Sequence, residues 1–306
     1  MLAHLALLFV LPQVAVDAAL KDVENPKKKK QEEPAPKPHK DDLLRRPFDW
    51  DVQFAPDNDL YRTYLADPRQ SKSGSKVQFP IKGGEDDNIK IENVLGGHRP
   101  LVGWTDGQHP DVEMQLLVEA AVFSRFDIQE GWDMDAADYR FGFPFLYRTG
   151  DVILKVHPYH ITSHMGDEYL SRVEGSHRKS YHLDEIAIGV SFPAAAMWRV
   201  YAEIGYGFYT GPETDAGRAQ IGAEYLLDPI SERIAPFIAV DLQTRNEIDW
   251  NWNASIMAGL MMIPKTGLGT GHGLRATLEY YRGSDSQTQF KEEREHFIAI
   301  GFAADF

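Results

Sequence analysis

The chain has 306 residues, of which 43% are hydrophobic and 11% aromatic, so it is long enough to bury a full-sized core. Its formal net charge is -14, which argues against nucleic acid as a partner because nucleic acid binds clustered basic residues. The absence of cysteine excludes disulfides, thiolate metal sites and a lipoprotein anchor. No apolar stretch reaches the roughly 18 residues that a membrane-spanning helix needs.

The N-terminal part of the chain predicts two segments that precede the folded domain. Residues 5–11 form an apolar run with the length of a signal-peptide core, and residues 16–18 fit a cleavage site, although no Lys or Arg precedes the run. We therefore expect residues 1–19 to be a signal peptide that exports the protein. Residues 20–47 are rich in charge and proline and include the lysine run 27–30, which favours a disordered linker.

From about Val77 onward, apolar residues alternate with polar or small ones in one segment after another. Side chains on a strand point alternately to opposite faces, so each segment is expected to be a strand with one apolar and one polar face. The alternation is clearest at 198–208, 250–260 and 298–306. Residues 60–66 could instead form one or two turns of helix.

A soluble β-sandwich would show the same alternation, but three further features favour a membrane barrel. The strands run to about 10–14 residues, whereas globular strands average about 5–6. Trp198, Trp250 and Tyr280 lie near strand ends, as in the aromatic girdle of a barrel. The chain ends on Phe306, which lies with Phe302 on the apolar side of the last strand. These two residues would form the signal for membrane insertion by the barrel-insertion machinery.

Strand counting sets the expected size of this barrel. Ten strands can be counted back from Phe306 to near Glu113, and two weaker candidates lie at about 76–83 and 90–104. We therefore predict an all-β protein in which residues 48–306 form an antiparallel transmembrane β-barrel of about twelve strands in the bacterial outer membrane. Its partners would be outer-membrane lipid and lipopolysaccharide. The polar faces carry charges of both signs, which must pair or stay wet, so the lumen could be plugged or open.

Residues 157–169 concentrate the side chains that could perform chemistry. Three of the eleven histidines fall here, and the carboxylates Asp167 and Glu168 follow them. Histidine is the most frequent general base, and carboxylates are ligands that calcium prefers. The segment could therefore be catalytic, could bind calcium, or could be a structural loop. The sequence indicates no other cofactor.

At this segment the chain resembles a known family, the outer-membrane-like bacterial proteins that contain the domain of unknown function 1207. Shared stretches lie at 64–69, 239–243, 249–251 and 280–283. The most specific stretch is the motif His160-Ile161-Thr162-Ser163-His164-Met165-Gly166-Asp167-Glu168-Tyr169. The resemblance runs from about residue 48 to the end of the chain. It implies a barrel fold, but it implies no activity because none is established for the family.

A local resemblance to the outer-membrane phospholipases A and the lipid A 3-O-deacylases suggests a mechanism. Those enzymes carry a His-x-Ser pair on a lipid-facing strand, with an orienting polar residue on the next strand. Here the pair would be His160 and Thr162, and Asp184 or Ser180 would orient the histidine. The neighbouring Ser163 would point to the other face unless a bulge intervenes.

Three functions remain open at this point. The first is a non-enzymatic barrel with a structural or binding role, since nothing in the sequence demands catalysis. The second is a hydrolase of acyl esters in outer-leaflet lipid or lipid A, which requires His160 and Thr162 to face the lipid. The third is a small passive pore, which requires a continuous wet lumen.

Overall fold

The computed structural model describes residues 50–81, 88–195, 197–212, 214, 217–262 and 273–305, all within the unit Phe48–Phe306. The predicted signal peptide, the predicted linker and Phe306 lie outside the described residues. Among the helices that the structure describes, none is long and apolar enough to cross a membrane.

The described residues form a single 14-stranded sheet in which neighbouring strands are antiparallel. Its strands are β1 (Trp50–Phe54), β2 (Ser73–Pro80), β3 (Lys90–Asp106), β4 (Val112–Asp127), β5 (Asp133–Gly142), β6 (Phe145–Thr149), β7 (Val152–Met165), β8 (Tyr181–Ala195), β9 (Trp198–Thr210), β10 (Gly217–Leu226), β11 (Ile234–Arg245), β12 (Trp252–Met262), β13 (Gly273–Ser284) and β14 (Arg294–Asp305). Three short helical segments lie between strands: α2 (Asp167–Arg172), η2 (Asn246–Ile248) and η3 (Thr288–Phe290).

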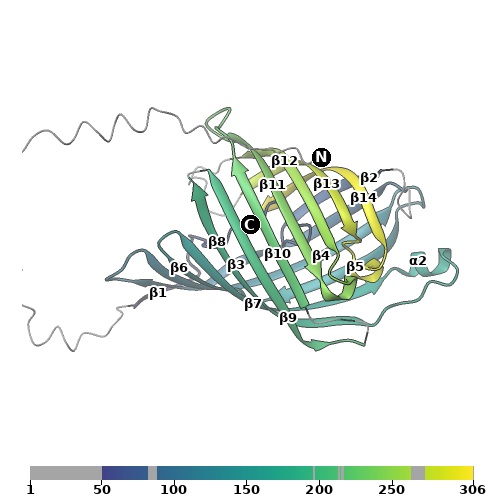
Figure 1. Ribbon diagram of the computed structural model, residues 1–306, viewed down its shortest axis with the longest axis horizontal. Coiled ribbons are helices and arrows are strands. Elements are labelled where there is room, and N and C mark those ends of the chain that lie inside the picture. The colour runs from purple at the N-terminus through teal and green to yellow at the C-terminus, as the bar shows by residue number, and fades with distance from the viewer. Residues whose placement is uncertain are drawn as a thin grey trace, which may run out of the picture. The chain divides into compact units, whose positions relative to one another are not determined.

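Twelve of these strands close into a barrel, because β14 pairs with β2, β2 with β3 and β3 with β4 (Figure 1). The two remaining strands extend the wall. β6 continues β5 after a break at 143–144, since both pair with β4 and β7. β1 pairs with the far end of β3, beyond the part that β2 covers. The prediction of about twelve strands is confirmed, and the two weak candidates are β2 and β3.

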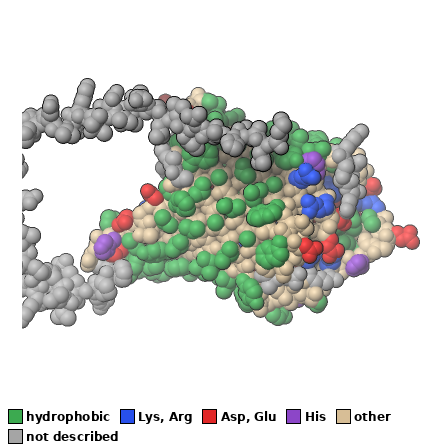
Figure 2. All heavy atoms as spheres, viewed as in Figure 1, with side chains coloured by type: hydrophobic (Ala, Val, Ile, Leu, Met, Phe, Trp, Pro, Cys, Tyr) green, Lys and Arg blue, Asp and Glu red, His purple; other side chains and the backbone are tan. Residues whose placement is uncertain are grey.

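The wall is apolar on the outside and polar on the inside, the reverse of a soluble protein. Inward-facing Glu119, Arg125 and Asp138 have no exposed surface. Large hydrophobic side chains are exposed on the outer face, among them Leu95, Leu154, Ile186, Ile188, Ile204, Phe208, Ile221, Ile238, Ile256, Leu260, Leu278, Ile300 and Phe302. Hydrophobic side chains spread over the middle of the visible wall in Figure 2, and charged ones gather toward its ends. Such a surface is favourable in lipid and unfavourable in water.

The two ends of the barrel differ in their connections. The turns β6–β7 and β8–β9 lie at one end, which we call the turn end. The connections at 166–180, which contains α2, and at 285–293 lie at the other, which we call the loop end. This division orients the strands for the sites described below.

Residues 55–72, which we call the plug, fold into the lumen at its turn-end side. The predicted helical turns at 60–66 are wrong, because the segment is irregular. Tyr64 is 4% exposed and stacks on Tyr201 of the wall with ring centroids 3.7 Å apart. The backbone N–H of Leu65 donates to Glu224 at 2.8 Å. Contacts with the wall therefore add to local hydrogen bonds, such as that from the Tyr64 N–H to Gln70 at 3.1 Å, in fixing the conformation of the plug.

The connection between β13 and β14 fills the lumen from the loop end, since residues 285–291 are all buried. The backbone N–H of Thr288 donates to Asp138 at 3.0 Å, and the amide of Gln289 donates to the carbonyl of Ser163 at 3.0 Å. A cavity of about 60 Å³ remains between the plug and this connection. The described lumen is therefore plugged.

Candidate functional site

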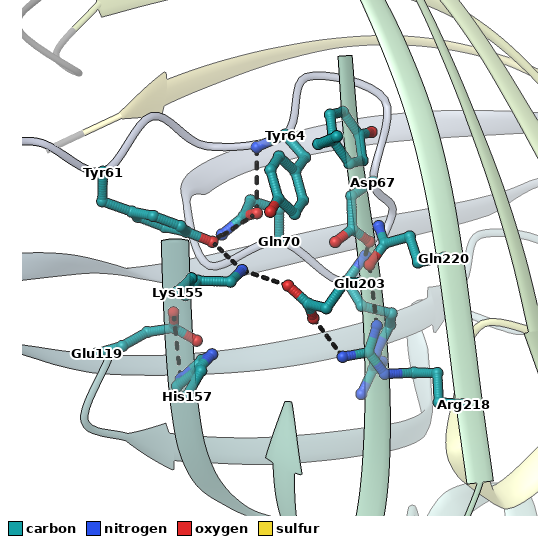
Figure 3. Close-up of polar contacts among 12 residues, drawn as sticks. Tyr61, Tyr64, Asp67, Gln70, Glu119, Lys155, His157, Glu203, Arg218 and Gln220 are labelled. Carbon is teal, nitrogen blue, oxygen red and sulfur yellow. Dashed lines mark hydrogen bonds and ion pairs between the residues drawn. The ribbon is translucent and has the colours of Figure 1, made fainter. Parts of the chain in front are cut away.

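The polar residues inside the barrel form a paired network that joins the wall to the plug (Figure 3). The Lys155 ammonium lies 2.6 Å from Glu203, and it faces the rings of Tyr61 and Tyr64 at 4.9 and 4.5 Å. Glu203 also forms an ion pair with Arg218 on the next strand. Each of these charges has an opposite partner, so the network is suited to holding the plug rather than to catalysis.

Further contacts attach the plug to other strands. The Arg199 guanidinium donates to the carbonyl of Thr63 at 2.5 Å, and the amide of Gln243 donates to Asp67 at 2.8 Å. Buried polar groups of this kind are stable only when their partners stay in place. The plug is therefore an integral part of the folded barrel.

A second polar site lies on the outer face, where His160 of β7 and Asp184 of β8 are direct cross-strand partners. His160 Nδ1 lies 2.5 Å from Asp184 Oδ1, and the two side chains are 48% and 31% exposed. A carboxylate at Nδ1 fixes the imidazole orientation and leaves Nε2 able to accept a proton. Asp184, and not Ser180, occupies the position that orients the histidine.

Thr162 lies on the same outer face, two residues from His160 toward the loop end. It pairs with Tyr139 of β5 and His182 of β8. Within the described residues no hydrogen bond joins its hydroxyl to the imidazole. Same-face neighbours on a strand are about 6.6 Å apart at Cα, so side-chain rotation can bring hydroxyl and imidazole together around a substrate.

The cross-strand pair of His160 and Asp184 lies at the boundary between the apolar and polar parts of the outer face. The next outward residues toward the turn end are apolar: Leu154, Val156, Pro158, Ile186 and Ile188. The next ones toward the loop end are polar: Thr162, His164 and His182. In a bilayer this boundary lies between acyl tails and headgroups, which is the depth of the ester bonds.

Aromatic residues surround the pair, and the sequence analysis did not identify them. Phe141 of β5 pairs with His160. β9 has a bulge opposite Asp184, and Phe208 and Tyr209, consecutive in sequence, are each 59% exposed. A bulge redirects side chains locally, so both rings reach the outer face. In the sequence, the bulge could have been recognised from these two adjacent aromatic residues, because they break the alternation of the strand.

The other residues of the motif 160–169 occupy positions where they support the fold rather than the site of His160. Ser163 faces inward and is 4% exposed, so it does not share the outer face with His160. His164 faces outward, and its ring lies edge-on to Tyr139 with centroids 5.7 Å apart. Gly166 lies so close to β5 that a Cβ there would be 1.8 Å from the carbonyl oxygen of Met134. Glycine is therefore required where the chain leaves β7.

The two motif carboxylates begin α2 at the surface. Asp167 forms an ion pair with Arg178, and both Asp167 and Glu168 are exposed. Calcium takes six to eight oxygen ligands, and in the described part of the chain no group of three or more His, Cys, Asp or Glu is placed to hold a metal. These residues fit calcium poorly, and no catalytic step is assigned to it. Phe302 is outward and 64% exposed on β14, and its role in insertion stays a prediction.

The fold is that of bacterial outer-membrane barrels. Outer membrane phospholipase A from Escherichia coli is 13% identical, over 76% of this chain and 90% of that chain, with a TM-score of 0.50. An outer membrane phospholipase dimer with bound calcium from Salmonella typhi is 12% identical over 81% and 92%, with a TM-score of 0.49. The KdgM porin is 5% identical over 77% and 99%, with a TM-score of 0.40. At these identities the likeness concerns the fold alone.

A search of curated protein sequences finds no match to this chain. The family described as protein of unknown function DUF1207 matches residues 14–306, in agreement with the resemblance that the motif at 160–169 indicated. The chain therefore belongs to the DUF1207 family.

Proposed function

We propose that this protein is an outer-membrane hydrolase of lipid acyl esters, with its reacting groups on the outer face of β7 and β8. The observation that supports it most is the pair of His160 and Asp184, hydrogen-bonded at 2.5 Å on the outer face. Ionisable side chains that face lipid are costly and mark functional sites by default. Thr162 supplies a hydroxyl on the same face at the same boundary.

In this mechanism Asp184 accepts a hydrogen bond from Nδ1–H of His160, and Nε2 acts as the base. Nε2 takes the hydroxyl proton of Thr162 while Oγ1 attacks the ester carbonyl carbon. The proton then passes to the leaving alcohol oxygen as its bond to the carbonyl carbon breaks, which leaves an acyl group on Thr162. Water, deprotonated by Nε2, attacks that acyl group, releases the fatty acid and returns the proton to Thr162.

The surroundings favour a lipid substrate over a soluble ester. Phe141, Phe208 and Tyr209 lie beside the pair and are 46–59% exposed on the surface that faces acyl tails. A lipid could thus reach Nε2 laterally from the bilayer. Phospholipid and lipid A both present acyl esters at this depth, and the assay must separate them.

The test is fatty-acid release by the refolded full chain from phospholipid and from lipid A, each with and without calcium. We expect His160→Ala and Thr162→Ala to lower the rate by about 1000-fold or more. The matched control is His164→Ala, which removes an outward histidine of the same strand and should keep the activity. No release by a folded wild type, or equal release by wild type and His160→Ala, would refute the proposal.

The second candidate is a structural or binding barrel without enzymatic activity. The plugged lumen favours it, because the buried polar groups there are used for pairing. A folded barrel that releases no fatty acid would leave this role. The same plugging disfavours the small passive pore, which needs a continuous water path.

A further inference from the structure

The mouth of the lumen at the turn end holds a pocket of about 240 Å³. Its described lining comprises the plug residue Arg62 and wall residues Arg148, Gly150, Asp151, Ile153, Ser191, Phe192, Pro193, Met197, Trp198, Arg199, Glu224 and Leu226. The pocket lies at the end of the barrel opposite α2, so it is separate from the pair of His160 and Asp184.

Two of the three arginines that line this pocket have a carboxylate partner, and the third has none among the described residues. Arg199 is paired with Glu224 at 2.6 Å, and Arg148 with Glu113 at 2.9 Å. Arg62 forms no ion pair with any residue that the structure describes. Burial and the neighbouring Arg199 lower the pKa of Arg62 to about 10 against the opposing effect of Glu224, so its guanidinium stays charged at neutral pH. Arg62 is half-buried, and the nearby Glu224 is already paired with Arg199, so a bound anion would supply the partner that the Arg62 guanidinium lacks within the described part of the chain.

The other features of the lining define what such an anion would look like. Asp151 is exposed at the tip of the β6–β7 turn, so water screens its charge from the pocket. Ile153, Met197 and Leu226 give the pocket an apolar side. A ligand with one negatively charged group and a short apolar body would match both sides.

We infer that this pocket binds an amphiphilic oxyanion, a phosphate or carboxylate on a short apolar body, held by the Arg62 guanidinium. Guanidinium donates two parallel hydrogen bonds to such groups. Four of the five N–H donors of Arg199 are already used by Glu224 and by plug carbonyls, so Arg62 has more donors to offer a ligand than Arg199 has. The ligand can be a soluble organic acid or the headgroup of a lipid, which share this chemistry.

The test is calorimetric titration of the refolded full chain in neutral detergent with hexyl phosphate, hexanoate and inorganic phosphate. We expect one of the two hexyl probes to bind more tightly than inorganic phosphate, and their order identifies the preferred anion. Arg62→Gln should weaken that binding about tenfold or more, and Arg62→Lys should retain part of it. The control is Arg233→Gln, which removes an exposed arginine from the β10–β11 turn.

Arg62→Gln is expected to fold, because Arg199 contacts the backbone carbonyl of Arg62, which the variant keeps. Repeating the titration in phosphatidylglycerol nanodiscs distinguishes the sources: binding lost there assigns a lipid headgroup, and binding retained assigns a soluble ligand. The inference is overturned if folded wild type binds neither hexyl probe, or if Arg62→Gln binds as tightly as wild type. Inorganic phosphate binding as tightly as hexyl phosphate also overturns it.

Discussion

Arg125 on β4 is the most informative position for testing how the lumen is held together. Its side chain has no exposed surface, and it contacts Glu92 of β3 at 2.7 Å, Glu295 of β14 at 3.0 Å, and Asp285 of the inward-folded connection. One cation therefore contacts three buried carboxylates from three parts of the chain, and Glu92 also pairs with Lys76 at 3.1 Å. Replacing it with methionine, which fills similar space, would leave those carboxylates facing one another.

Removing one partner of a buried ion pair destabilises a protein by roughly 3–5 kcal/mol. We expect Arg125→Met to lower the free energy of unfolding by at least about that much, because three acceptors lose a shared donor. The assay is urea unfolding of protein folded into vesicles, followed by tryptophan fluorescence. Arg233→Met, at an exposed position, should change the free energy by less than about 0.5 kcal/mol.

A second substitution separates electrostatics from packing. Adding Glu295→Gln to Arg125→Met removes one of the unbalanced carboxylates and should recover part of the lost stability, since residues in one network do not act additively. A loss below about 1 kcal/mol for Arg125→Met would refute the reasoning, as would a double variant less stable than the single one. Either result would mean that the carboxylates find water or other donors.

Three further outcomes are expected. Wild type in planar bilayers should conduct little, and Gly-Ser linkers of equal length in place of both 60–66 and 285–291 should raise single-channel conductance; equal conductance would contradict plugging. Gly166→Ala should destabilise the loop end by about 1–3 kcal/mol through the clash with Met134, seen as faster hydrogen exchange and proteolysis there; unchanged exchange would contradict it. Asp184→Asn should slow fatty-acid release by up to about 10000-fold while Thr162→Ser keeps it, and an unaffected rate in Asp184→Asn would rule out its orienting role.

The strand pattern was readable from the sequence because a strand alternates its side chains locally. That alternation, the strand lengths and the absence of a long apolar run were sufficient for a barrel of about twelve strands, and the closed barrel has twelve. The same parity placed His160 and Thr162 on one face of their strand. No contact with another strand was needed for these conclusions.

Other features depended on tertiary structure. Asp184 lies opposite His160 only because of the register between β7 and β8, and a connection of 15 residues, 166–180, separates these strands. Register across so long a connection cannot be counted from sequence. The bulge at Phe208 likewise depends on how β9 meets β8.

The conformation of the plug is the feature that the sequence predicted least well. The plug residues have no period, and the sequence at 60–66 was compatible with one or two turns of helix. Its backbone is instead held by partners far away in the sequence, such as Glu224, which lies 159 positions from Leu65. The sequence by itself determined the barrel, because alternation is a local property of each strand. Only the closed barrel decided that its lumen is filled, because the groups that bind the plug come together when the ring forms.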